Sequence, residues 1–161
     1  MKFDIERERR FLVKRMPRRF VENCGKEITQ WYICLDPPVR VRIEDFDDCS
    51  LTVKIDKDPD LGERYELEDD IPKDAILALA KAKKGDKIRK TRYQIGNLEL
   101  NVFCGILGGL VLLEFEIKSE EDVFLMPFGF LAEEVTGDER FEGHNLAQLD
   151  CIPDDWKCEI I

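Results

Sequence analysis

The 161-residue chain has a length typical of one domain, and its 43% apolar and 37% charged residues fit a globular protein with many charges on its surface or in its interior. Its formal net charge of −10 disfavours general binding to nucleic acid, and no apolar run approaches the roughly 18 to 20 residues of a membrane span or forms the apolar core of a signal peptide. The sequence therefore predicts a single domain over residues 1–161 in the cytoplasm, with no nucleic-acid partner and no membrane partner.

Most of the chain alternates apolar and polar residues, which is the period of a half-buried β-strand. Segments rich in Pro, Gly and Asp separate the alternating stretches. The expected strands, in chain order, are residues 2–13, 28–34, 39–46, 49–56, 62–70, 86–95, 97–104, 110–118 and 131–136. Many strands of similar length joined by short turns predict an antiparallel barrel or sandwich.

The expected helices are few and short. One covers 17–23, with Pro17 in its first turn, and the longest covers 72–85, between Pro72 and Gly85. A third is expected to begin in the segment 118–124, capped by Ser119, and a fourth covers 143–149.

The cysteines do not form a metal-binding pattern. Six are scattered along the chain without a C-x-x-C pair, and the single histidine, His144, has no partner motif. Because zinc sites built on thiolates need closely spaced ligand pairs, the sequence predicts free thiols in a reducing compartment.

Pairs of fully charged residues two positions apart recur on the expected strands. Three are carboxylate pairs and two are cation pairs: Glu6/Glu8, Glu66/Glu68, Glu114/Glu116, Arg40/Arg42 and Lys90/Arg92. On any single strand such a pair is typical of the solvent-facing side. Their repetition on strand after strand predicts instead a barrel with a charged interior, whose apolar outer face is covered by the helices.

A charged interior is costly unless its groups are paired or ligated. Its natural contents are an anion held by Arg and Lys and a hard divalent cation held by Glu. Carboxylates without histidine or thiolate favour Mg²⁺ or Mn²⁺. Metal, phosphates and arginines together are the components of phosphoryl transfer.

Six short segments, in order, resemble the motifs of the CYTH, or triphosphate tunnel metalloenzyme, superfamily. They are "IERERRFLV", "VRVRI" followed by "LTVKI", "RYELEDDIP", "KTRYQI", "LELNVFCGILGGLVLLEFEI" and "EEVTGDERF". The resemblance covers about residues 2–147. It implies an eight-stranded antiparallel β tunnel that binds triphosphate groups together with a divalent metal.

The resemblance also implies roles for individual residues. The E-x-E-x-K motif corresponds to Glu6, Glu8 and Arg10, which are the expected catalytic residues. The expected triphosphate-binding residues are Arg40, Arg42, Lys54, Arg64, Lys90 and Arg92. The expected metal ligands are Glu6, Glu8, Glu114 and Glu116, assisted by Glu66 and Glu68. Two positions depart from the family pattern, since Arg10 replaces the usual lysine and Asn101 stands where an acidic residue is common.

These observations predict a mainly β (α+β) protein that acts as a metal-dependent triphosphatase, a phosphoric anhydride hydrolase, with Mg²⁺ or Mn²⁺ as cofactor. Its expected substrate is a small-molecule triphosphate, most simply inorganic tripolyphosphate. Two alternatives stay open: a class IV adenylate cyclase, and a non-catalytic protein that binds polyphosphate or nucleotide. A homodimer is the one assembly considered, and the sequence does not determine the oligomeric state.

Overall fold

The computed structural model describes residues 1–161 and is dominated by one continuous β-sheet. Its strands are β1 (Lys2–Met16), β2 (Lys26–Leu35), β3 (Pro38–Glu44), β4 (Asp48–Asp58), β5 (Glu63–Asp70), β6 (Ile88–Ile95), β7 (Leu98–Cys104), β8 (Val111–Glu116), β9 (Leu131–Glu134) and β10 (Glu159–Ile160). The first eight match the strands expected from the alternation in order and closely in bounds.

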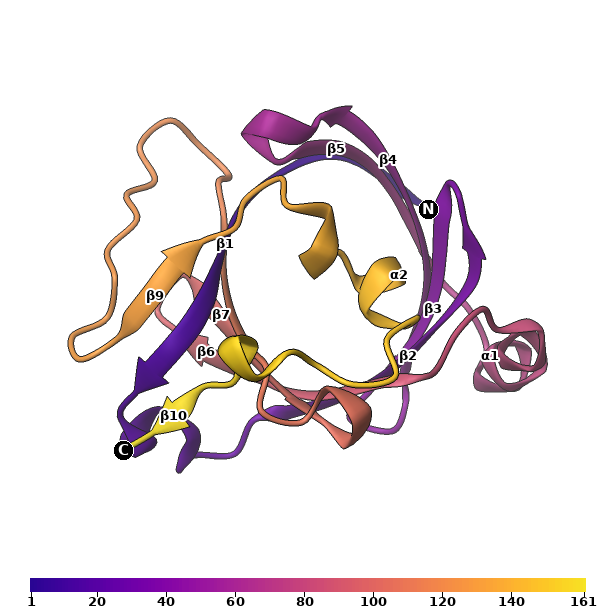
Figure 1. The fold of residues 1–161 in the computed structure, drawn as a ribbon. Coiled ribbons are helices and arrows are strands. Elements are labelled where there is room, and N and C mark those ends of the chain that lie inside the picture. The colour runs from indigo at the N-terminus through magenta and orange to yellow at the C-terminus, as the bar shows by residue number, and fades with distance from the viewer.

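Eight of these strands form a closed antiparallel barrel, in the order β1-β5-β4-β3-β2-β6-β7-β8 and back to β1 (Figure 1). The long β1 closes the ring because it pairs with β5 through Lys2–Arg7 and with β8 through Glu8–Leu12. The same strand carries β9 and β10 beyond the barrel. The predicted eight-stranded antiparallel barrel is confirmed.

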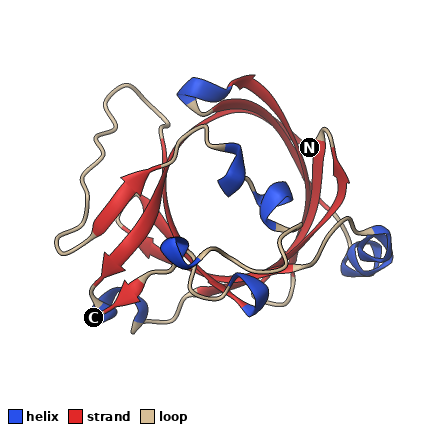
Figure 2. Cartoon of the chain, viewed as in Figure 1, coloured by secondary structure: helices blue, strands red, loops and turns tan.

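Helices are short and few (Figure 2). The α-helices are α1 (Lys73–Leu79) and α2 (Gly143–Leu146), and the 3-10 helices cover Arg18–Val21, Pro59–Leu61, Ala80–Ala82, Gly105–Leu107, Glu139–Phe141 and Asp154–Trp156. No helix is long and apolar enough to span a lipid bilayer.

The helix expected to begin near Ser119 is absent. The side chain of Asp122 accepts hydrogen bonds from the backbone N–H groups of Lys118 and Ser119, at 2.7 and 2.8 Å. These bonds hold the chain in a turn, a competing use of Asp that disfavours helix. The segment that follows runs over the outside of the barrel without regular structure.

The outer face of the barrel is covered only in part by helices. Helix α1 places Ile76 on Val41 and Cys49 of β3 and β4, as expected. The face of β1, β7 and β8 is covered mainly by the irregular segment 117–130, whose Phe124 stacks on Phe11 with 4.4 Å between ring centroids. The expectation that helices cover the outer face was therefore right for β3 and β4, where α1 packs, and wrong for most of the face of β1, β7 and β8.

The interior divides along the barrel axis into a charged half and an apolar half. On β1, Glu6, Glu8 and Arg10 face inward in one half and Leu12 in the other, and β8 shows the same change between Glu114 and Leu112. Residues from the segment 135–156 fill the apolar half: Val135, Phe141, Leu146, Ala147, Ile152 and Trp156. Figure 1 shows α2 and the 3-10 helix Glu139–Phe141 inside the ring of strands, while α1 lies outside it.

Candidate active site

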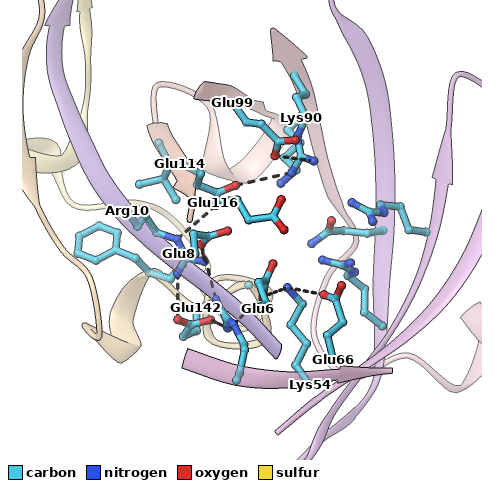
Figure 3. Close-up of a pocket in the computed structure, with 18 of the residues that line it drawn as sticks. Glu6, Glu8, Arg10, Lys54, Glu66, Lys90, Glu99, Glu114, Glu116 and Glu142 are labelled. Carbon is cyan, nitrogen blue, oxygen red and sulfur yellow. Dashed lines mark hydrogen bonds and ion pairs between the residues drawn. The ribbon is translucent and has the colours of Figure 1, made fainter. Parts of the chain in front are cut away.

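A cavity of about 490 Å³ occupies the charged half of the barrel. Every predicted site residue lines it: Glu6, Glu8, Arg10, Arg40, Arg42, Lys54, Arg64, Glu66, Glu68, Lys90, Arg92, Glu114 and Glu116. They come from six of the eight barrel strands, so the charged pairs spread along the sequence converge on one space (Figure 3).

Arg10 connects several buried carboxylates on one side of the cavity. Its Nη2 donates to Glu8 Oε1 at 2.8 Å, its Nε to Glu114 Oε1 at 3.2 Å and its Nη1 to Glu142 Oε1 at 3.0 Å. Nη1 also donates to the carbonyl oxygen of Phe141 at 3.1 Å. Only 9% of Arg10 is exposed, so these bonds form in a largely dehydrated environment.

The β-strand pleat places Arg10 on the opposite face of β1 from the two other arginines of this stretch. Arg9 and Arg7 point out of the barrel, where they pair with Glu134 and Glu63. Gly62, with φ +65°, allows the β4–β5 turn to lie against this part of β1, because a Cβ at Gly62 would come within 2.1 Å of the Glu8 carbonyl oxygen. The turn therefore fixes the backbone that presents Glu8 to the cavity.

Four of the six predicted phosphate-binding cations are paired with carboxylates: Arg42, Arg92, Lys54 and Arg64, of which the last two lie on the carboxylate side of the cavity. Lys54 Nζ lies 2.7 Å from Glu6 Oε2 and 2.8 Å from Glu66 Oε2. Arg64 pairs with Glu6 at 3.0 Å and with Glu142 at 2.8 Å. These cations neutralise the carboxylate side of the cavity before any anion arrives.

The opposite side of the cavity carries cations with few anionic partners. Arg40 makes no ion pair and donates only to Thr52 Oγ1, at 3.1 Å. Lys90 is buried without a carboxylate partner and lies over the ring of Phe103, at 5.4 Å from the ring centroid. Burial, together with repulsion by Arg92, lowers the pKa of Lys90 well below its ordinary value. An anion placed here would relieve both effects.

Arg42 and Arg92 complete this cationic side. Arg42 lies 3.1 Å from Glu44 and 3.4 Å from Glu68, and burial with repulsion by Arg40 lowers its pKa to about 10. The Nε atoms of Arg40 and Arg42 are buried and lack a hydrogen-bond partner. Buried donors without acceptors are rare in proteins, and here they are available to the oxygens of an anion.

The carboxylates Glu6, Glu8 and Glu114 form the other side. Burial and repulsion by Glu114 raise the pKa of Glu8 to about 7. Burial also acts to raise the pKa of Glu114, but Lys90 and Arg10 outweigh it and hold that pKa below its ordinary value. The mutual repulsion of these three carboxylates is what a bound divalent cation would remove.

The residues present fit a hard divalent cation. The cavity offers carboxylate oxygens and contains no histidine or cysteine among its lining residues, the ligand chemistry of Mg²⁺ or Mn²⁺. No three metal-binding side chains lie close enough together to form a ligand set, because the carboxylates are paired with Arg10, Lys54 and Arg64.

The remaining predicted metal ligands lie at the periphery of this group. Glu66 is paired with Lys54, and Glu68 accepts from Thr52 Oγ1 at 3.0 Å. The side chain of Glu116 is 49% exposed and lies 3.7 Å from Lys118. Their contacts favour Glu6, Glu8 and Glu114 as the residues nearest to a common cation.

Asn101 explains how the chain accommodates the loss of an acidic residue at this position. It is fully buried, its Nδ2 donates to Glu114 Oε2 at 2.8 Å, and its Oδ1 accepts from Arg92 Nε at 2.9 Å. The amide therefore links a residue of the carboxylate side to one of the cationic side without adding charge.

Glu142 is a cavity residue that sequence reasoning missed. It belongs to no strand and precedes α2, so no alternation marked it. The following Gly143 allows the close approach, since a Cβ there would lie 2.0 Å from the hydroxyl oxygen of Tyr32. A glutamate followed by glycine directly after the "EEVTGDERF" motif was the only available signal.

No protein-family model matches the sequence. An inorganic triphosphatase of Nitrosomonas europaea is 38% identical over 93 residues, a match that covers 53% of this chain and only 59% of that relative. The crystal structure of an inorganic triphosphatase is 30% identical, with a TM-score of 0.59, and the match covers 88% of this chain and 93% of that one. A candidate adenylate cyclase of Bacillus halodurans is similar in fold, with 18% identity, a TM-score of 0.54 and coverage of 75% and 84%.

Proposed function

The chain belongs to the triphosphate tunnel (CYTH) family, and from this premise we propose that it hydrolyses inorganic tripolyphosphate to pyrophosphate and phosphate with the help of Mg²⁺ or Mn²⁺. Triphosphatases of this family typically depend on a divalent metal. The observation that carries the proposal is the division of one cavity into a cationic side with unpartnered donors and a side of mutually repelling carboxylates.

The cationic side would bind the phosphate chain. Arg40 and Lys90 are free of carboxylate partners, so anion binding costs them no existing ion pair. The planar guanidinium of Arg40 suits bidentate contact with phosphate oxygens, whereas Lys90 acts as a point charge. Arg42 and Arg92 add positive charge along the same side.

The carboxylate side would hold the metal and direct water. Glu6, Glu8 and Glu114 are the residues that would hold a divalent cation, which when bound neutralises phosphate charge and polarises the terminal phosphoryl group. A carboxylate of the same side would orient the water that attacks the terminal phosphorus. The cations of the opposite side stabilise the charge on the departing pyrophosphate.

One assay tests this proposal against its alternatives. The purified protein is incubated with tripolyphosphate, ATP or thiamine triphosphate, each with Mg²⁺ or Mn²⁺, and phosphate, pyrophosphate and cyclic AMP are measured. Phosphate released from tripolyphosphate, and its loss on chelation of the metal, is the expected result. Cyclic AMP with pyrophosphate would identify a cyclase instead, and tight binding without turnover would identify a binding protein.

A matched pair of variants connects the assay to the cavity. Glu114→Gln should lower turnover by at least a hundredfold, because it removes a carboxylate that faces the metal and the substrate. Glu134→Gln changes a carboxylate outside the barrel, which pairs with the outward-facing Arg9, and should leave turnover within twofold of the unmodified protein. Equal turnover in the two variants would show that the cavity is not the site of hydrolysis.

A further inference from the structure

Glu142 lines the charged cavity together with Glu6, Glu8 and Arg10 (Figure 3). Its two carboxylate oxygens bind different arginines, Oε1 with Arg10 at 3.0 Å and Oε2 with Arg64 at 2.8 Å. These arginines and burial leave its pKa at about 2, although burial alone would raise it, so the group is an anion at neutral pH. A carboxylate of the chain thus occupies two of the cations that line the cavity.

Behind Glu142 lies a second cavity, of about 270 Å³. Glu142 lines both cavities together with Glu8, Arg10, Lys54 and Arg64, so the ion pairs among these residues form the partition between them. Phe141 and Leu146, which flank Glu142 in sequence, are buried in the apolar core and keep this partition in place.

The rear cavity does not attract anions. Besides Glu8 and Glu142, four carboxylates line it: Asp36, Asp56, Glu139 and Glu63, of which Glu63 is paired with Arg7 and Lys57. Its three basic residues, Arg10, Lys54 and Arg64, are all held in ion pairs already. A polyphosphate that reaches the partition therefore meets fixed negative charge ahead of it.

The partition lies directly beside Glu8. Arg10 donates to Glu8 from Nη2 and to Glu142 from Nη1, so one guanidinium group separates the two carboxylates. A phosphoryl group that stops against the partition must then lie at the carboxylate side of the cavity. Any further phosphoryl groups extend away from it, along the cationic side.

We propose that Glu142 is a specificity-determining residue that stops an inorganic polyphosphate chain at the rear of the cavity, so that only its terminal phosphoryl group reaches Glu8. This inference rests on the proposed function and adds to it the bond that is cleaved. The water oxygen bonds to the terminal phosphorus, the bond from that phosphorus to the bridging oxygen breaks, the shortened chain leaves with the electron pair, and the water proton passes to bulk water. Each event then releases one orthophosphate.

Linear tetraphosphate distinguishes the cleavage sites, whereas triphosphate gives the same products from either bond. The unmodified protein should convert tetraphosphate initially to triphosphate and orthophosphate alone. Glu142→Ala removes the stop, lets one more phosphoryl group pass Glu8, and should raise the initial yield of pyrophosphate from tetraphosphate at least tenfold. Products are separated by ion chromatography at low conversion.

Two further variants control the measurement. Glu139→Ala removes a carboxylate that lines only the rear cavity and forms no ion pair, and it should keep the unmodified product pattern. Glu142→Gln keeps the size of the side chain and serves if the alanine variant does not fold. Thermal melting establishes which variants are folded. If a folded Glu142 variant still forms only triphosphate and orthophosphate, the proposed stop is wrong.

Binding without metal separates this inference from the proposed hydrolysis. By calorimetry, the unmodified protein should bind triphosphate and tetraphosphate with affinities within twofold, because the fourth phosphoryl group stays outside the cationic side. In Glu142→Ala, tetraphosphate should bind at least fivefold more tightly than triphosphate. A protein that binds in this pattern but releases no phosphate would contradict the hydrolase and keep the stop, whereas an unchanged affinity ratio would contradict the stop itself.

Discussion

Replacing Arg10 by methionine tests how strongly one buried guanidinium group holds the cavity together. Methionine keeps much of the length of the side chain but removes every donor to Glu8, Glu114 and Glu142. Breaking a buried ion pair by removing one partner typically costs about 3 to 5 kcal/mol, because the other charge stays buried. Arg64 still contacts Glu142 and Glu8, at 2.8 and 3.6 Å, so we expect the lower end, about 3 kcal/mol.

The adjacent Arg9 supplies the matched control. It lies on the same strand but points outward, and its side chain is 36% exposed in its pair with Glu134. Exposed pairs contribute about 0.2 to 1 kcal/mol, so Arg9→Met should cost no more than that. Urea unfolding at neutral pH, followed by tryptophan fluorescence, gives both free energies of unfolding. For a chain of this length, 3 kcal/mol corresponds to a melting temperature lower by roughly 6 to 12 °C.

A double variant separates the cost of leaving buried carboxylates without a partner from the cost of lost packing. In the Arg10→Met background, Glu142 has lost one of its two arginine partners. Glu142→Gln removes this carboxylate and should restore at least 0.5 kcal/mol of the free energy of unfolding, the lower limit of coupling typical of groups in contact. If Arg10→Met and Arg9→Met destabilise the protein equally, the buried network contributes nothing beyond a surface pair and the reasoning fails.

Two further predictions follow from the charges of the cavity. Lys90→Met should raise the free energy of unfolding by about 1 kcal/mol, since it removes a buried cation without a carboxylate partner. The same variant should bind tripolyphosphate at least tenfold more weakly in the absence of metal. Urea unfolding measures the stability and calorimetry the binding, and a loss of stability with unchanged binding would contradict this prediction. Glu142 has a lowered pKa, so its stabilisation is complete above the unfolded value of about 4.3 and is lost as the pH falls toward about 2. The difference in unfolding free energy between the unmodified protein and Glu142→Gln should therefore shrink by about 1 kcal/mol between pH 7 and pH 3.5, and a constant difference would refute the assignment.

The sequence predicted the barrel because its strands carry a regular period of two, which the pleat converts directly into an inner and an outer face. The same period placed Glu8 and Arg10 inside and Arg9 outside, and the structure has them there. What the period could not reveal is which cations already have partners. Arg64 and Lys54 resemble Arg40 in sequence, but only the folded structure shows that the first two are paired with carboxylates.

The sequence predictions failed in segments that do not alternate apolar and polar residues. Asp122 accepts two backbone N–H groups and replaces the expected helix near Ser119 by a turn, a choice that depends on a few local hydrogen bonds. Glu142 reaches the cavity through packing of Phe141 and Leu146 into the barrel core, which involves residues far away in sequence. Such contacts have no periodic signature, and the resemblance motif ended before it reached Glu142.

The closure of the barrel through β1 has a consequence for how the protein acquires its site during synthesis. β1 is made first, yet its barrel partners β5 and β8 follow at residues 63–70 and 111–116. At ribosomal rates of about 5 to 20 residues per second, Glu6 and Glu8 wait for seconds before β8 is available. A ring closed by its first and last strands has a high contact order, which makes folding slow. The nascent chain therefore bears its acidic residues in open solvent throughout this interval, and the cavity that we propose to bind phosphate is assembled only when the ring closes.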